Sequence, residues 1–80
     1  MPASLSITLH NAMQEACHFT VVDNISGKTL LDDDMDEDAT KTVKVLPGVG
    51  GEGDISYTPL NGLTIREISL EDGATVDMRS

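Results

Sequence analysis

The sequence has little of what marks several large classes of protein. Cys17 is its one cysteine, so no disulfide can form within the chain, and a small secreted domain held together by disulfides is excluded. It has no tryptophan, and Phe19 and Tyr57 are its only aromatic residues. The interior is therefore expected to consist mainly of aliphatic side chains.

Basic residues are also scarce, five against fourteen acidic ones, which gives a formal net charge of −9. Binding to nucleic acid depends on many contacts between basic side chains and phosphates, so a nucleic-acid partner is not expected. An anionic membrane surface is disfavoured for the same reason. A surface of this charge favours cations, basic proteins or neutral ligands.

Long apolar segments are missing as well. No apolar segment follows Met1 as a signal peptide requires, and no apolar run reaches the roughly 18 residues of a membrane-spanning helix. The expected location is the cytoplasm. The chain length of 80 residues suits one domain, which is predicted over residues 1–80.

The feature that the chain does have is an alternation of apolar and polar residues with a period of two. Leu5, Ile7 and Leu9 show it, and Val76 and Met78 show it again near the end. Strands are predicted over residues 5–10, 17–22, 28–31, 42–45, from Ile55 to near Pro59, over residues 63–70, and around Val76 and Met78. This spacing predicts an all-β fold, a small antiparallel β-sandwich of the immunoglobulin-like or Greek-key type or an open barrel, with about seven short strands.

Three local features are predicted between and within these strands. Asn61-Gly62 indicates a hairpin with a type I′ turn, in which both central residues take positive φ. In the strand that follows, the positions predicted to face inward change from odd numbers to even numbers at Ile68 and Leu70. One extra residue would cause this change, which indicates a β-bulge near Arg66-Glu67. Residues 11–16 are expected to form a loop with one helical turn.

The acidic segment, residues 32–38, is the most unusual part of the sequence. Six of its seven residues are aspartate or glutamate. Two like charges about 6 Å apart repel by roughly 0.7 kcal/mol in water. We expect the segment to be a loop that either stays extended and solvated or is neutralised by a cation.

Calcium is the cation that such a loop suits best, because it takes six to eight oxygen ligands. The predicted ligands fall at alternate positions: Asp32, Asp34, Asp36 and Asp38. The segment departs from an EF-hand, since its neighbours are predicted strands rather than helices. The alternative is a solvated acidic loop that binds no ion.

Other motifs carry less weight. Gly48, Gly50 and Gly53 fit the letters of a phosphate-binding loop, but a strand rather than a helix is predicted to follow them. Cys17 and His18 are adjacent on a strand and face opposite sides, so a shared transition metal is not expected. No pattern of a known type of enzyme active site is present.

The leading hypothesis is a non-enzymatic interaction module, with another protein or a second copy of the chain as its partner. The contact would use a sheet face, a free strand edge or the acidic segment. Two alternatives stay open. One is a calcium-binding β-domain, and the other is an acidic antagonist that covers the basic surface of its partner, which requires carboxylates spread over one face.

Overall fold

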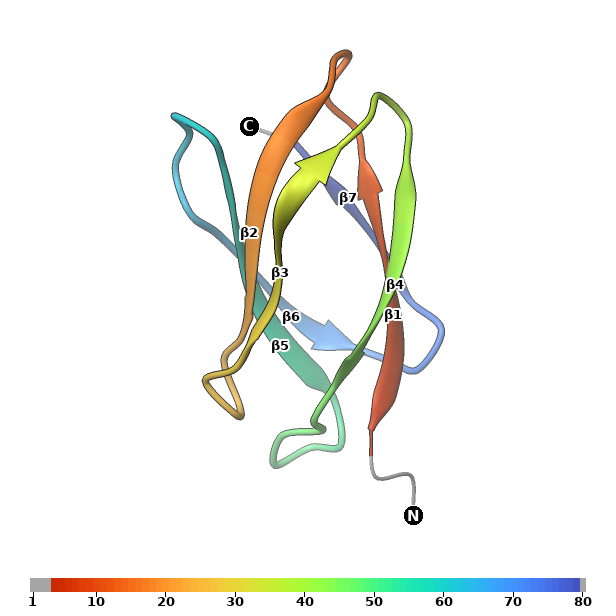
Figure 1. Ribbon diagram of the computed structural model, residues 1–80. Helices are drawn as coiled ribbons and strands as arrows, with labels where there is room; N and C mark the ends of the chain where they lie inside the picture. Colours follow the sequence, from red (N-terminus) through yellow and green to blue (C-terminus); the bar gives the residue numbers. More distant parts are fainter. Residues whose placement is uncertain (1–3, 80) are drawn as a thin grey trace.

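The structure, a computed structural model, describes residues 4–79 and is built from seven β-strands (Figure 1). They are β1 (Leu5–Asn11), β2 (Cys17–Asp23), β3 (Thr29–Met35), β4 (Thr40–Val45), β5 (Gly53–Pro59), β6 (Ile65–Leu70) and β7 (Thr75–Met78). Across these residues there is no helix of the length and apolarity needed to cross a membrane. The two ends of the predicted domain, residues 1–3 and residue 80, lie outside the described range.

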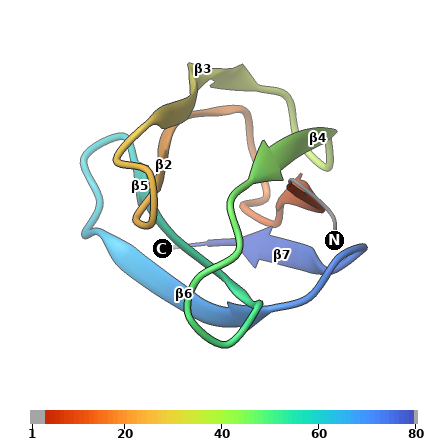
Figure 2. The ribbon, with the colours of Figure 1, turned by 90° about the horizontal axis from the view of Figure 1, so that it is seen from below.

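The strands form two sheets that enclose one interior (Figure 2). Sheet A has the order β4-β1-β7, and sheet B has the order β3-β2-β5-β6. The antiparallel pairs β1–β4 and β2–β5 each join strands that are three apart in the chain, which is a Greek-key connection. The predicted all-β sandwich or open barrel is confirmed.

β7 is the exception to the antiparallel pairing, because it runs parallel to β1. The turn after β6 leads the chain from sheet B to sheet A. There Thr8 donates its backbone N–H to the carbonyl of Ala74 at 2.9 Å, and Gly73 donates to the carbonyl of Ser6 at 2.7 Å. The sandwich is thus predominantly, but not wholly, antiparallel.

The interior contains the side chains that the alternation predicts. Leu5, Ile7 and Leu9 on β1 are at most 4% exposed, and Val76 and Met78 on β7 are equally well covered. Burial of a large apolar side chain contributes roughly 1.5–3 kcal/mol. These contributions hold the two sheets together.

Both aromatic residues lie in this interior as well. Phe19 on β2 and Tyr57 on β5 meet edge to face, with ring centroids 6.5 Å apart and planes at 68°. This geometry adds about 0.5–1.5 kcal/mol to the burial of the two rings. The core is therefore aliphatic around one aromatic pair.

β3 is longer than predicted. It continues past Leu31 to Met35 and so contains the first three aspartates of the acidic segment. Leu31 and Met35 are buried, but Asp32, Asp33 and Asp34 between them are all exposed, so the alternation of burial is interrupted at Asp33. The prediction that the whole acidic segment is a loop is wrong for its first half.

The connection between β5 and β6 also differs from the prediction, because it spans residues 60–64. Asn61 has a φ of 62°, but Gly62 is not among the residues with positive φ, so the type I′ turn is wrong. The N–H of Gly62 donates to the carbonyl of Pro59 at 2.9 Å. A Cβ on Gly62 would lie 3.2 Å from the Pro59 ring, so close packing is what favours glycine here.

The predicted bulge in β6 is confirmed, but it lies slightly later in the strand. Ile55 pairs with Glu67 and Gly53 pairs with Leu70, which leaves Ile68 and Ser69 as the irregular stretch. Ser69 has a φ of 60°. Leu70 is buried as predicted, but Ile68 is 59% exposed, so its predicted inward orientation is wrong.

The β1–β2 connection contains bends but no helix, so the predicted helical turn within residues 11–16 is wrong as well. β1 extends through Asn11, and the loop proper covers residues 12–16. The backbone N–H of Asn11 donates to the carbonyl of Ala39 at 2.9 Å, and that of Ala12 donates to the carbonyl of Met78 at 2.9 Å. These long-range bonds replace the local bonds of a helical turn.

Gly53 is buried where the two sheets approach each other, and its replacement by alanine tests this packing. The added Cβ would lie 3.0 Å from Val45 Cγ2 and 3.3 Å from Leu70 Cβ. We expect Gly53→Ala to lower the free energy of unfolding by about 1–3 kcal/mol, measured by urea denaturation.

Gly50→Ala is the matched control, because its Cβ would meet only the end of the Glu52 side chain, at 3.4 Å. Its expected effect is within about 0.5 kcal/mol. Equal losses in the two variants would show that the approach of the sheets does not restrict position 53.

Candidate functional site

One end of the sandwich collects carboxylates from several elements. We define the acidic end as the end at which β1, β3, β5 and β7 finish and at which residues 12–16, 36–39 and 60–64 connect the strands (Figure 1). Its carboxylates belong to Glu15, Asp34, Asp36, Glu37, Asp38 and Asp77. Residues that are far apart in the sequence thus share one surface. Lys41 on β4 and Arg79 after β7 are the basic residues near it.

A buried asparagine holds the segments of the acidic end together. Asn11 is 1% exposed, and its Nδ2 lies 3.0 Å from each of three backbone carbonyls, those of Glu15, Met35 and Asp36. Its Oδ1 accepts the backbone N–H of Met13 at 2.9 Å. One side chain therefore fixes the β1–β2 loop against the end of β3.

The turn that follows β3 presents the second half of the acidic segment. The N–H of Ala39 donates to the carbonyl of Asp36 at 3.0 Å, which closes the turn. Asp38 has a φ of 65° within it, a conformation that aspartate tolerates better than most residues. Asp36, Glu37 and Asp38 are all exposed.

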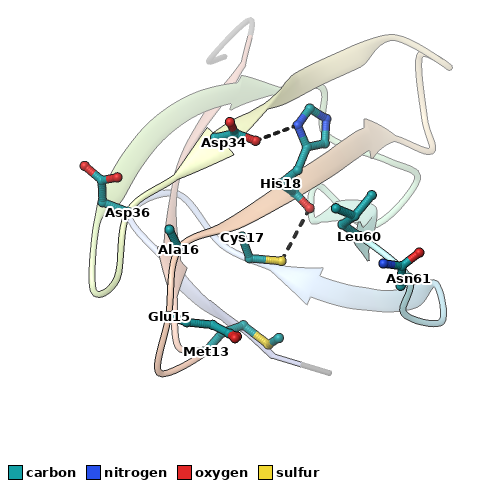
Figure 3. Close-up of a pocket in the computed structure, with 9 residues that line it drawn as sticks. All are labelled: Met13, Glu15, Ala16, Cys17, His18, Asp34, Asp36, Leu60 and Asn61. Atoms are coloured by element: carbon teal, nitrogen blue, oxygen red, sulfur yellow. Dashed lines mark hydrogen bonds and ion pairs between the residues drawn. The ribbon is translucent and has the colours of Figure 1, made fainter.

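An open pocket of about 460 Å³ lies beside this turn (Figure 3). It is lined by Met13, Glu15, Ala16, Cys17, His18, Asp34, Asp36, Leu60 and Asn61. In Figure 3, Met13 and Glu15 lie on the side of the β1–β2 loop and Leu60 lies on the side of the β5–β6 loop. The pocket combines apolar surface with three carboxylates.

His18 contacts two aspartates on the outer face of sheet B. Its Nδ1 lies 2.9 Å from Asp34 Oδ1, and its Nε2 lies 2.7 Å from Asp32 Oδ1. The antiparallel register causes this, since His18 pairs with Asp34 and Thr20 pairs with Asp32. The hydrogen bonds to Asp32 and Asp34 raise the pKa of His18 above its ordinary value.

His10 has the same arrangement on the outer face of sheet A. Its Nε2 lies 2.5 Å from Asp38 Oδ1, and its Nδ1 lies 2.9 Å from Asp77 Oδ1. Asp77 is brought there by the parallel pairing of β7 with β1. The hydrogen bonds to Asp38 and Asp77 raise the pKa of His10.

The four predicted calcium ligands are distributed over these features rather than gathered at one point. Asp32 and Asp34 contact His18, Asp38 contacts His10, and Asp36 lines the pocket. Within residues 4–79, no group of three or more histidine, cysteine, aspartate or glutamate side chains is placed to hold a metal ion. The calcium site stays a prediction.

Three further aspartates, Asp23, Asp54 and Asp72, lie toward the opposite end of the sandwich. Asp23 is buried and accepts the backbone N–H groups of Ile25 and Leu46, each at 2.9 Å. Asp72 accepts the backbone N–H of Ser6 at 2.7 Å. These two carboxylates therefore hold backbone segments of the chain in place.

Asp54 is the third of these aspartates, and a basic side chain partly neutralises it. Arg66 donates from Nε to Asp54 Oδ1 at 3.0 Å and from Nη2 to Oδ2 at 2.5 Å, and Asn24 also donates to Oδ1. The bonds from Arg66 and then from Asn24 lower the pKa of Asp54 to about 2. This carboxylate is already engaged within the chain.

The two histidine–aspartate clusters were not predicted from the sequence. The alternation along β2 places His18 on the face of the strand opposite to Cys17, but neither histidine was connected with aspartates. A signal for one cluster was present, because Asp32 and Asp34 fall on one face of an extended chain. The short connection between β2 and β3 then brings His18 opposite them.

Comparisons with models of protein families, with curated proteins and with solved structures found no match for this chain. The site is therefore interpreted from its geometry and charge.

Replacement of Asn11 tests whether its amide holds the acidic end together. We expect Asn11→Leu, which keeps the approximate volume but makes no hydrogen bonds, to lower the free energy of unfolding by roughly 2–4 kcal/mol. The reason is that buried carbonyls and the Met13 N–H lose their partner. Urea denaturation measures the loss.

Asn24→Ala is the control, because Asn24 is exposed and its bonds to Asp54 and Ser56 face water. Its expected cost is below about 1 kcal/mol. If both substitutions cost the same, the buried amide has no special role.

Proposed function

We propose that this chain is a non-enzymatic binding module that engages a positively charged protein surface through its acidic end. The observation that supports this most strongly is the convergence of carboxylates from the β1–β2 loop, β3 and the β3–β4 turn beside one pocket. The carboxylates are therefore not confined to one loop, and this favours a broad basic contact over a single bound ion.

The pocket supports a partner that carries lysine and arginine. Their long aliphatic stems pack on apolar surface while the charged heads reach carboxylates. Met13 and Leu60 offer such apolar surface, and Glu15, Asp34 and Asp36 line the same pocket. In this proposal one lysine or arginine side chain of the partner enters the pocket, and weaker contacts with the β3–β4 turn surround it.

The overall charge supports a partner of opposite sign over a second copy of this chain. Each of two copies would carry a net charge of −9, so two copies would repel each other if they met at their acidic ends. Complementary charge, in contrast, raises the rate of encounter with a basic protein. We place this interaction in the cytoplasm, where the single thiol of Cys17 would stay reduced.

The non-enzymatic part of the proposal is supported by how the reactive groups are used. Both ring nitrogens of His10 and of His18 contact aspartates. The thiol of Cys17 donates to the carbonyl of His18 at 3.5 Å rather than to a base. Neither histidine is free to activate a nucleophile in this arrangement.

Binding of a short arginine-rich peptide, measured by isothermal titration calorimetry at pH 8 or above, tests the proposal. We expect saturable binding at low ionic strength that weakens as salt is added, because exposed charges are screened. Glu15→Gln with Asp36→Asn is expected to weaken it about fivefold, from roughly 0.5 kcal/mol for each exposed ion pair.

The matched control is Glu52→Gln with Glu71→Gln, which removes the same charge from exposed positions outside the acidic end. It is expected to change the affinity by less than about twofold, from screening of distant charges. Equal losses in both double variants would contradict a localised contact, and no binding at low salt would contradict the proposal as a whole.

A further inference from the structure

The two histidine clusters share a geometry that only one protonation state satisfies. A neutral imidazole has one N–H donor and one acceptor nitrogen, whereas a carboxylate only accepts hydrogen bonds. Each ring contacts a carboxylate oxygen at both nitrogens, at 2.7 and 2.9 Å for His18 and at 2.5 and 2.9 Å for His10. Both contacts can be hydrogen bonds only when the ring is an imidazolium.

The clusters also lie at the two ends of the acidic segment. His18 on sheet B contacts Asp32 and Asp34 in the first half of the segment. His10 on sheet A contacts Asp38 at its far end, and it also contacts Asp77 on β7. The segment crosses from one sheet to the other, so the two rings hold it against both.

We propose that His10 and His18 form a pH-dependent clasp that holds the acidic segment when both rings are protonated and exposes its charge to a basic partner when they are neutral. This regulation rests on the proposed function. Loss of the proton leaves each ring with one donor for two carboxylates, so a nitrogen lone pair then faces an oxygen lone pair. Each loss also removes the positive charge that had offset one carboxylate.

The charged groups around each ring determine which protonation state of the histidine is favoured. On sheet A, Asp38 and Glu37 of the turn and Asp77 of β7 lie around His10, and Arg79 contacts Asp77 at 3.6 Å. Arg79 opposes the protonated ring by competing for Asp77, but the nearest charges to His10 are carboxylates.

On sheet B, Asp32 and Asp34 of β3 lie beside His18, and Asp36 lines the same pocket. From the β5 side the chain contributes Leu60, whose N–H donates to the His18 carbonyl at 2.9 Å. The charges nearest to this ring are therefore also carboxylates, and they favour the protonated form.

The sign of the pH dependence follows from these contacts. Both histidines have a pKa raised above about 6.5, so each binds its proton more tightly in the folded chain than in the unfolded one. The stabilisation is complete below about pH 6.5 and is lost as the pH rises through the raised pKa. Binding of a basic partner changes in the opposite sense and strengthens over that same range.

Nuclear magnetic resonance titration of the ring Cε1–Hε1 signals tests the clasp without any partner. We expect both midpoints above 6.5. Asp32→Asn with Asp34→Asn should lower the midpoint of His18 and leave that of His10 unchanged, which makes His10 an internal control. Midpoints at or below 6.5 in the native chain would overturn the proposal.

The same arginine-rich peptide tests the regulation, because its guanidinium groups do not titrate in this range. We expect its affinity to rise several-fold between about pH 6 and pH 8.5. The variant His10→Gln with His18→Gln should bind with nearly constant affinity across that range.

Two outcomes separate the regulation from the proposed function. Peptide binding that does not change with pH, with both midpoints raised, would overturn the regulation and leave the proposed function standing. Absence of binding at every pH, with both midpoints raised, would contradict the proposed function and overturn the regulation with it.

Discussion

The acidic end depends on one buried amide. Asn11 closes one end of a mainly apolar interior, and its side chain meets the backbone of the β1–β2 loop and of the end of β3. The polar backbone groups of a loop and a turn cannot be covered by apolar side chains without partners, because an unpaired buried group costs about 1–3 kcal/mol. Among residues 4–79, no buried side-chain nitrogen or oxygen lacks a partner.

This anchoring explains how the chain tolerates so much negative charge in one place. Repulsion between exposed carboxylates acts to separate the acidic segment from its neighbours. The segment nevertheless has a defined path, because β3 pairs with β2 through its first half and because Asn11 holds the carbonyls of Met35 and Asp36. The two histidines then offset part of the charge. At the opposite end, Asp23 and Asp54 are engaged by backbone N–H groups and by Arg66 instead.

The fold was predictable where a residue's position in the alternation decided its environment. Leu5, Ile7 and Leu9 face inward because successive side chains of a strand point to opposite faces and the apolar face is the one that is buried, and the sequence pattern contains that information. The pattern failed at Ile68, since an extra residue in β6 reverses the facing of every later side chain and its position depends on how Gly53 pairs with Leu70.

The site was less predictable, because it is assembled by contacts between strands. The acidic residues were recognised from composition, and their charge suggested a loop. The first half of the segment instead belongs to β3, because Leu31 and Met35 on either side of the aspartates are buried in the core. That His10 meets Asp77 depends on a parallel pairing with β7 that no local pattern indicates. The role of Asn11 was invisible for the same reason, since its partners are carbonyls whose positions only the tertiary structure fixes.

The acidic end depends on the Asn11 amide being buried and bonded there. The most direct measurement is hydrogen exchange of the two Asn11 side-chain Nδ2 protons by nuclear magnetic resonance, with the exposed amide of Asn61 as the reference. We expect the Asn11 protons to exchange far more slowly than those of Asn61. Exchange of both amides at the same rate would show that Asn11 reaches water, and that it does not hold the acidic end together.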